Sequence, residues 1–132
     1  MIADLRGLIA GRTGNAVIVD VNGVGYLVHA SGRTLDTLGE VGSEARFVVV
    51  TQVREDAITL YGFADTVERD VFLMLTSVQG VGARLGLSLL SLADPGKLLF
   101  AIASEDKGFI THADGVGPKL ATRIISELRD RA

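Results

Sequence analysis

The spacing of hydrophobic residues changes near residue 63 of the chain. Before this point, short runs rich in Val, Ile and Leu alternate with polar positions, and tight turns separate the runs, as expected for β-strands. From Asp65 onward, hydrophobic residues recur every three or four positions, which is typical of helices. The sequence therefore predicts a strand-built domain at residues 1–63 and a helical domain at residues 64–132.

The first domain is expected to contain five strands and one short helical turn. Asn22-Gly23 is a strong hairpin signal between two of the strands, because both residue types tolerate positive φ. Five short strands with tight turns are typical of a small closed or partly closed barrel such as the OB-fold. The expected strands are 2–10, 17–21, 25–30, 45–54 and 57–63, and the helical turn is 34–38.

The second domain is expected to be a compact bundle of short helices. Asp65 and Glu68 have the three-residue spacing of a capping box ahead of the first helix. Asp94-Pro95 supplies a cap and a proline at the first helical position, and Pro118 opens the last helix. The helices expected after the first are 83–92, 95–103, 107–112 and one from 118 to the C-terminus.

Composition excludes several classes of protein. Hydrophobic residues make up 48% of the 132 positions, which is enough for a buried core. No apolar run approaches the ~20 residues that span a bilayer, and the N-terminus lacks a secretory signal, so we expect a cytoplasmic protein without a membrane partner. Without cysteine and with only two histidines, the chain is not expected to hold a metal or another cofactor.

The net charge of −3 argues mildly against a nucleic-acid partner, but the acids are unevenly distributed. No acidic residue lies between Val71 and Ala93, or between Gly115 and Ser126. The acids collect at residues 36–44 and at residues 55–56 instead. This distribution permits an anion-accepting face on an acidic protein.

The chain contains Gly-Val-Gly three times. One copy, Gly23-Val24-Gly25, leads into a predicted strand. The other two copies, 35 residues apart, each lie between two predicted helices. The first glycine would end one helix in a left-handed conformation, and the second would open the next helix. Free backbone N–H groups at a helix start, together with the helix dipole, attract an anion. A single copy would be a plain connector, but two copies with the same basic offset predict phosphate binding. The candidate residues are Gly80, Val81, Gly82, Arg84, Gly115, Val116, Gly117, Lys119 and Arg123.

The segments MIADLRG, NGVGYLVH and VREDAITLYGF, followed by the two hairpins, resemble the bacterial RuvA family of Holliday-junction-binding proteins. The resemblance covers essentially the whole chain. It implies an N-terminal OB-fold domain, a tandem helix–hairpin–helix DNA-binding domain, and non-catalytic, sequence-independent binding of four-way DNA junctions in recombination and repair.

The same resemblance implies further partners. Family members form a homotetramer, with a face-to-face octamer left open, and a third domain contacts the motor protein RuvB. That third domain is expected to be absent from this chain, and a junction resolvase is a further partner that the resemblance leaves open.

Arg54-Glu55-Asp56 lies between two predicted strands and would by itself be interpreted as a solvated hairpin tip. The resemblance implies that Glu55 and Asp56, beside Arg54, form an acidic pin at the junction centre. Two residues depart from the family pattern. Gly86 stands where such hairpins usually have alanine, and Asp114 places a negative charge beside the second hairpin.

Two other functional classes stay open at this level. A helix–hairpin–helix glycosylase would need a catalytic acid about twenty residues after a hairpin, and Glu105 and Asp106 match that spacing poorly. A helix–hairpin–helix metal nuclease would need converging carboxylates, and the sequence offers no such cluster beyond Glu55-Asp56. An OB-fold interaction protein would use both hairpins as connectors.

His29 is expected to be a surface histidine or a strand histidine with its hydrogen bonds satisfied, and packing is favoured over a place near phosphate for His112. Tyr61 is expected in the barrel core with Phe63.

Overall fold

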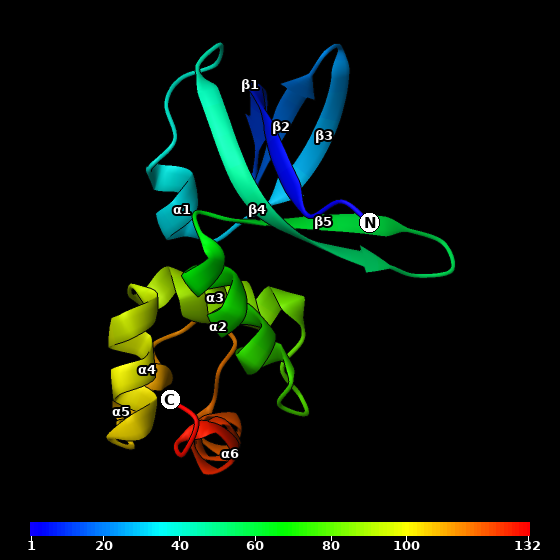
Figure 1. Cartoon of the computed structure of the whole chain (residues 1–132). Helices are drawn as coiled ribbons and strands as arrows, with labels where there is room; N and C mark the ends of the chain where they lie inside the picture. Colours follow the sequence, from blue (N-terminus) through cyan, green and yellow to red (C-terminus); the bar gives the residue numbers. More distant parts are fainter. The chain divides into compact units, whose positions relative to one another are not determined.

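The computed structural model describes all 132 residues, with five strands and one short helix followed by five further helices (Figure 1). Two compact units divide the chain, Met1–Arg69 and Asp70–Ala132, so the first turn of α2 belongs to the first unit. The strands are β1 (Asp4–Thr13), β2 (Ala16–Val21), β3 (Val24–His29), β4 (Glu44–Val53) and β5 (Ile58–Phe63). The helices are α1 (Gly32–Asp36), α2 (Thr66–Thr76), α3 (Ala83–Leu92), α4 (Pro95–Ala103), α5 (Lys107–Ile110) and α6 (Pro118–Leu128).

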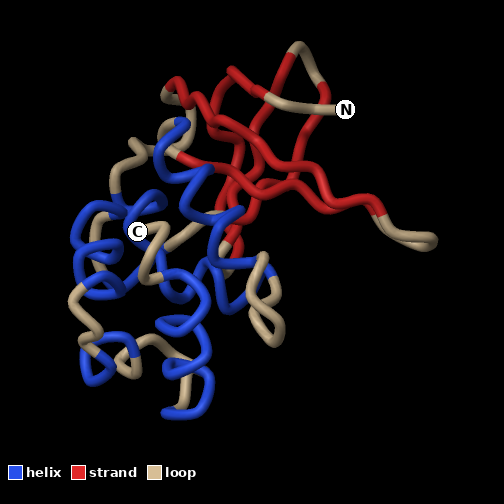
Figure 2. The backbone as a smooth tube through the Cα atoms, turned by 60° about the horizontal axis from the view of Figure 1, so that its bottom comes forward, coloured by secondary structure: helices blue, strands red, loops and turns tan.

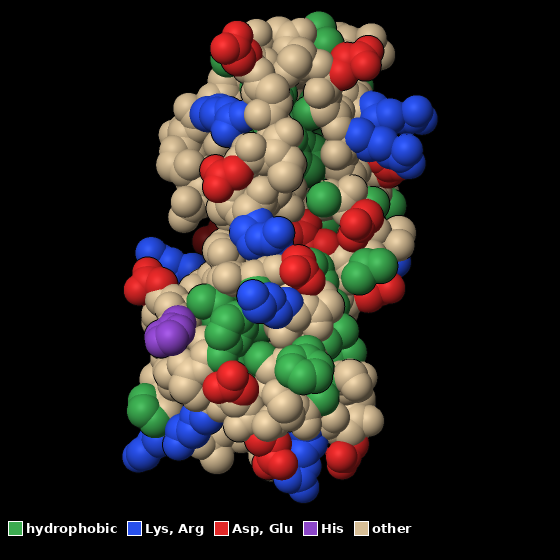
Figure 3. Space-filling view, turned by 90° about the vertical axis from the view of Figure 1, so that its left-hand side faces the viewer, with side chains coloured by type: hydrophobic (Ala, Val, Ile, Leu, Met, Phe, Trp, Pro, Cys, Tyr) green, Lys and Arg blue, Asp and Glu red, His purple; other side chains and the backbone are tan.

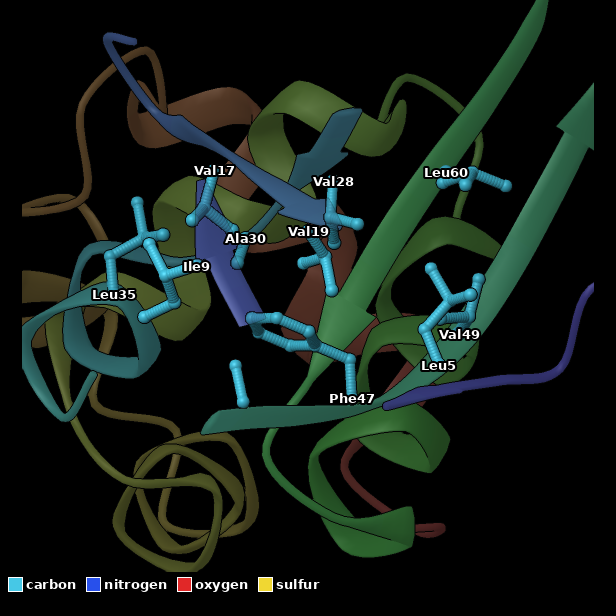
Figure 4. Packing of buried hydrophobic residues seen from close by; sticks show 11 residues of the cluster. Leu5, Ile9, Val17, Val19, Val28, Ala30, Leu35, Phe47, Val49 and Leu60 are labelled. Atoms are coloured by element: carbon cyan, nitrogen blue, oxygen red, sulfur yellow. The ribbon is translucent and has the colours of Figure 1, made fainter. Parts of the chain in front are cut away.

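The five strands close into a barrel in the order β1-β2-β3-β5-β4, which confirms the predicted fold class. β3 and β5 pair in parallel, and the other neighbouring strands are antiparallel. Alternate side chains fill the interior, and Figure 4 shows Ile9, Val19 and Phe47 pointing into it. Where β1 passes β2 there is no room for a side chain, because a Cβ on Gly7 would collide with the carbonyl oxygen of Asp20.

A buried carboxylate joins α1 to the first turn of α2. Glu68 is only 5% exposed, and its carboxylate accepts hydrogen bonds from Thr34 Oγ1 at 2.8 Å and Ser31 Oγ at 3.1 Å. It also accepts the backbone N–H of Ala64 at 2.8 Å. One half of the predicted capping box is confirmed, since the Glu68 N–H donates to Asp65 Oδ1 at 2.9 Å. The carboxylate binds Ala64 where a capping box would have it bind the Asp65 N–H.

The helices of the second unit begin where the sequence predicted. α3 and α4 match their predicted ranges, and Asp94 Oδ1 accepts the Lys97 N–H at 2.9 Å in front of Pro95. α5 ends at residue 110 and α6 at residue 128, both earlier than expected. No single helix is long and apolar enough to cross a membrane, although α3 and α4 taken together across a 97° bend meet that test.

Two expectations about aromatic and histidine side chains were wrong. Phe63 is fully buried but does not belong to the hydrophobic cluster that fills the barrel, and Tyr61 is only half-buried, with its hydroxyl donating to Gln52 Oε1 at 3.2 Å. Tyr61 lies on the outer side of the barrel wall, where its ring centroid is 6.0 Å from that of His29. His112 is exposed, so packing does not explain it. Strand alternation places Tyr61 outward, because its neighbours Leu60 and Gly62 are both buried.

Removing the buried carboxylate should destabilise the barrel unit. Glu68→Ala leaves two hydroxyls and one backbone N–H without their acceptor, and each buried unsatisfied group costs about 1–3 kcal/mol. We expect the free energy of unfolding to fall by about 2–4 kcal/mol in urea denaturation followed by circular dichroism. Glu127→Ala is the matched control on an exposed position of α6, with an expected change below about 0.5 kcal/mol. Equal effects of the two substitutions would contradict the structural role of Glu68.

Candidate functional site

The first Gly-Val-Gly turn connects α2 to α3 through one left-handed residue and one extended residue. Gly80 has φ +94°, and Gly82 is the N-cap of α3 with φ −87° and ψ −176°. Val81 between them is buried, and its N–H donates to the Val78 carbonyl at 3.0 Å. The turn is therefore anchored by its valine while both glycines are exposed.

The second Gly-Val-Gly turn, between α5 and α6, repeats this geometry. Gly115 has φ +86°, and Gly117 is the N-cap of α6 with φ −90° and ψ 178°. Val116 is buried, and its N–H donates to the Ala113 carbonyl at 3.1 Å. The equivalence predicted from the sequence repeat thus extends to backbone conformation, burial and hydrogen bonding.

The two hairpins also hold each other, through contacts that sequence reasoning did not find. Ser88 Oγ donates to the Asp114 carbonyl at 2.7 Å, and an Arg123 guanidinium N–H donates to the Gln79 carbonyl at 3.3 Å. The two donors are 35 residues apart, and so are the two acceptors. Each hairpin therefore supplies a donor, eight residues after its first glycine, to the carbonyl that precedes the other hairpin's first glycine.

Apolar contacts also run from each hairpin to the other. A Cβ on Gly80 would lie 3.3 Å from Leu120 Cδ1, and a Cβ on Gly115 would lie 2.7 Å from Leu85 Cδ2. Leu85 and Leu120 are also 35 residues apart. The hairpins are thus related by an approximate two-fold exchange, which sets the spacing between the starts of α3 and α6. The 35-residue repeat in the sequence could have suggested these pairs.

The helices that follow the two turns differ from the others in how they begin. The helices α1, α2, α4 and α5 each have a side chain that accepts a backbone N–H of the first turn, from Ser31, Asp65, Asp94 and Asp106 respectively. Glycine precedes α3 and α6, and no side chain caps either helix. The N–H groups of residues 83–85 and 119–120 therefore have no helical acceptor. A Cβ on Gly82 or Gly117 would meet nothing within 4 Å, so the space in front is open.

Basic side chains border these open helix starts. Arg84 and Lys119 are exposed, and neither makes a hydrogen bond or an ion pair in the structure. Arg123 is exposed as well, but it uses one donor on the Gln79 carbonyl. Free N–H groups, helix dipoles and nearby cations together can hold an anion at each turn.

The two turns are not chemically identical. Pro118 stands at the first position of α6 and has no N–H, whereas Ala83 at the equivalent position of α3 has one. The exposed carboxylate of Asp114 adjoins the second turn, where the first turn has the neutral Gln79. The first turn is therefore the better anion acceptor of the pair.

Gly86, the departure noted in the first hairpin, has a packing reason. A Cβ at this buried position would lie 3.1 Å from the ring of Phe72 and 3.1 Å from Thr76 Cγ2. Both neighbours belong to α2, so the glycine lets α2 and α3 approach more closely than an alanine would.

The predicted acidic tip lies at the end of the β4–β5 hairpin, which extends beyond the rest of the barrel (Figures 1 and 2). The Arg54 N–H donates to the Ala57 carbonyl at 2.8 Å and closes the turn. Arg54, Glu55 and Asp56 are all exposed, and none of them forms an ion pair. The tip therefore presents two free carboxylates to whatever approaches it.

The charged side chains of one face are of mixed sign. On the face shown in Figure 3, Lys and Arg side chains are interspersed with Asp and Glu. No group of three His, Asp or Glu side chains is placed to hold a metal ion. The two acids that an enzyme hypothesis would use have structural partners: Glu105 pairs with Arg129 at 3.2 Å, and Asp106 caps α5.

Two protein-family models match the chain, one within each unit. Residues 1–62 match the model described as RuvA N terminal domain, and residues 72–130 match the model described as SAM-like Helix-hairpin-helix tandem. The matches agree with the barrel and with the two hairpins seen in the structure.

Curated relatives match along the whole chain. It is 56% identical over 132 residues, 100% of its length, to a protein of Paramagnetospirillum magneticum, and covers 62% of that protein. It is 56% identical over 131 residues, 99% of its length, to a protein of Gluconobacter oxydans, and covers 66% of that protein. It is 53% identical over 131 residues, again 99% of its length, to a protein of Acidiphilium cryptum, and covers 64% of that protein. All three relatives are named Holliday junction branch migration complex subunit RuvA. The chain thus spans about two thirds of their length or slightly less.

Alanine substitutions should separate the two glycines of one turn. Gly115→Ala forces a left-handed backbone on an alanine and pushes against Leu85, so the free energy of unfolding should fall by about 1–2 kcal/mol or more. Gly117→Ala has ordinary backbone angles and open space, and should cost less than about 1 kcal/mol. Thermal unfolding of the two variants measures this difference. If both substitutions are equally harmless, the left-handed turn does not constrain the hairpin.

Proposed function

This chain belongs to the RuvA family, and on that premise we propose that it binds four-way DNA junctions through their sugar–phosphate backbones without catalysing a reaction. The observation that carries the proposal is the pair of reciprocally packed hairpins, each followed by a helix whose start no side chain caps. The names of the relatives supply the kind of DNA. The cytoplasm is the proposed location.

Each hairpin is proposed to bind one phosphate group. Backbone N–H groups at the start of α3 or α6 would donate to the phosphate oxygens, and Arg84 or Lys119 would add charge. Arg123 has five guanidinium donors, and one of them holds the Gln79 carbonyl. The remaining donors stay available to a phosphate. The proposed contacts are Gly80, Val81, Gly82, Arg84, Gly115, Val116, Gly117, Lys119 and Arg123.

Contacts of this kind explain the proposed lack of sequence preference. Phosphates carry no direct information about base sequence, so hairpins that hold only phosphates would grip any duplex arm. Binding should weaken as salt rises, because each neutralised phosphate releases counterions. Two spaced phosphate sites per chain, repeated in a homotetramer, would gain affinity through multivalency.

The acidic tip is proposed to supply preference for the junction over plain duplex. Glu55 and Asp56 carry free carboxylates that would repel the phosphates of a continuous duplex lying across them. At the centre of an open junction the strands diverge and leave the tip between them. The hairpins would thus give affinity, and the tip would penalise the wrong substrate.

The division of labour follows the domains. Residues 1–63 are proposed as the OB-fold domain that carries the tip, and residues 64–132 as the DNA-binding domain. We assign contact with the RuvB motor to the part of the relatives that this chain does not match. The proposed assembly is a tetramer with a junction on one face, or an octamer that encloses the junction. A junction resolvase is proposed as a further partner.

Aspartate at the two helix starts should stabilise the fold and prevent binding. Gly82→Asp with Gly117→Asp provides an N-cap and favours the helix dipole, so the melting temperature should stay equal or rise. The new carboxylates occupy the free N–H groups and repel phosphate, and junction affinity should fall at least about tenfold per site. Fluorescence anisotropy with a labelled four-way junction in magnesium-free buffer measures this.

Gly82→Asn with Gly117→Asn is the matched control, since asparagine caps equally well without the charge. It should bind more weakly than the parent and more tightly than the aspartate variant. Parent-like affinity of the aspartate variant would refute phosphate binding at the turns.

Neutralising the tip should improve the binding of the wrong substrate. Glu55→Gln with Asp56→Asn removes the repulsion, so affinity for linear duplex should rise about three- to tenfold while junction affinity changes less. The measurement is the ratio of junction to duplex affinity at several salt concentrations. A ratio unchanged from the parent would remove the tip from the proposal and leave the hairpins unaffected.

A further inference from the structure

A pair of exposed hydrophobic side chains lies directly below the acidic tip. Val53 and Ile58 face each other as cross-strand partners at the ends of β4 and β5. Their side chains are 60% and 68% exposed, respectively. This part of the hairpin extends outside the rest of the barrel (Figures 1 and 2).

The pair continues the core-facing side of the hairpin beyond the barrel. Along β4 the inward positions include the buried Val49, and along β5 they include the buried Leu60. Because side chains alternate with a period of two, Val53 and Ile58 fall on this same side. They remain hydrophobic although no element of the chain covers them.

The charges beside the pair limit what can bind it. A phosphate is disfavoured, because the carboxylates of Glu55 and Asp56 lie only two residues from Val53 and Ile58 respectively and outnumber the single cation, Arg54. Direct packing of this pair against the same pair of a second copy is disfavoured, because it would bring four free carboxylates into close, partly desolvated contact. The flat face of a nucleobase is neutral and apolar, and it meets neither objection.

We propose that Val53 and Ile58 contact the face of a nucleobase at the crossover of the junction. This inference rests on the proposed function, since it needs the tip to lie at the junction centre. Within a continuous duplex every base face is covered by its neighbours, whereas the branch point offers faces that stacking does not cover. Apolar side chains in other DNA-binding proteins act as wedges against such faces. The pair would thus favour the junction by attraction where the carboxylates disfavour duplex by repulsion.

The test replaces the two side chains with threonine. Val53→Thr with Ile58→Thr keeps β-branched residues in both strands and removes apolar surface. Val24→Thr with Val41→Thr is the matched control, because these valines are similarly exposed and lie elsewhere in the first unit. The probe is a fixed four-way junction with 2-aminopurine beside the branch point, compared with a junction carrying it in mid-arm and with a linear duplex.

We expect the parent to raise the fluorescence of 2-aminopurine at the branch point and not in mid-arm. The variant with Val53→Thr and Ile58→Thr should lose most of this increase in fluorescence. Its affinity for the junction should fall about fivefold, and its affinity for duplex should change less than about twofold. The control variant should behave like the parent. Loss of junction and duplex affinity in equal measure, or an unchanged branch-point signal, would overturn the inference.

The mass of each variant in solution tests the remaining alternative, in which Val53 and Ile58 contact another copy of the chain. If the variant with Val53→Thr and Ile58→Thr forms a smaller oligomer than the parent protein, the pair joins copies of the chain, and the inference fails. A parent without preference for the junction would refute the proposed function itself. If the parent protein prefers the junction and the variant with Val53→Thr and Ile58→Thr binds both DNAs as the parent does, only the base contact is refuted.

Discussion

Each Gly-Val-Gly hairpin is held by the other, and the helical unit depends on this reciprocal contact. Helices of about ten residues are marginal in isolation, so their ends must be fixed by tertiary contacts. Ser88 and Arg123 fix them by holding the carbonyls of Asp114 and Gln79. Because the contacts cross between hairpins, neither turn can move without disturbing the other, and the distance between the two helix starts is set by the fold.

The helices differ in how their N-termini are capped, and the difference follows the repeated turns. Side-chain oxygens cap four helices, so suitable capping residues are available throughout the sequence. Only the two helices behind the repeated turns have glycine in that position. An acidic protein can therefore attract an anion, because backbone N–H groups provide the donors and the acids lie away from both helix starts except at Asp114.

Local rules predicted most of the fold, and long-range contacts account for what they missed. Caps, prolines and alternation are signals within a few residues, and they placed α3, α4 and the closed barrel correctly. The sequence also located both turns. It did not reveal that Glu68 would bind Ser31 and Thr34, which are 37 and 34 residues away, or that Arg123 would bind Gln79, because such partners depend on how elements pack. Tyr61 was misplaced because its hydrophobic character was weighed above the alternation of β5.

Leaving two helix starts uncapped links stability to binding. An N-cap side chain typically contributes about 1 kcal/mol, so α3 and α6 forgo stabilisation that the other helices have. A phosphate at the same N–H groups would restore it, and it would do so only in the folded state. The left-handed glycines shape both turns, and the buried valines anchor them. On the proposed function, the unit is shaped in advance for a phosphate that supplies the missing acceptors, and this would account for two turns with similar backbone angles.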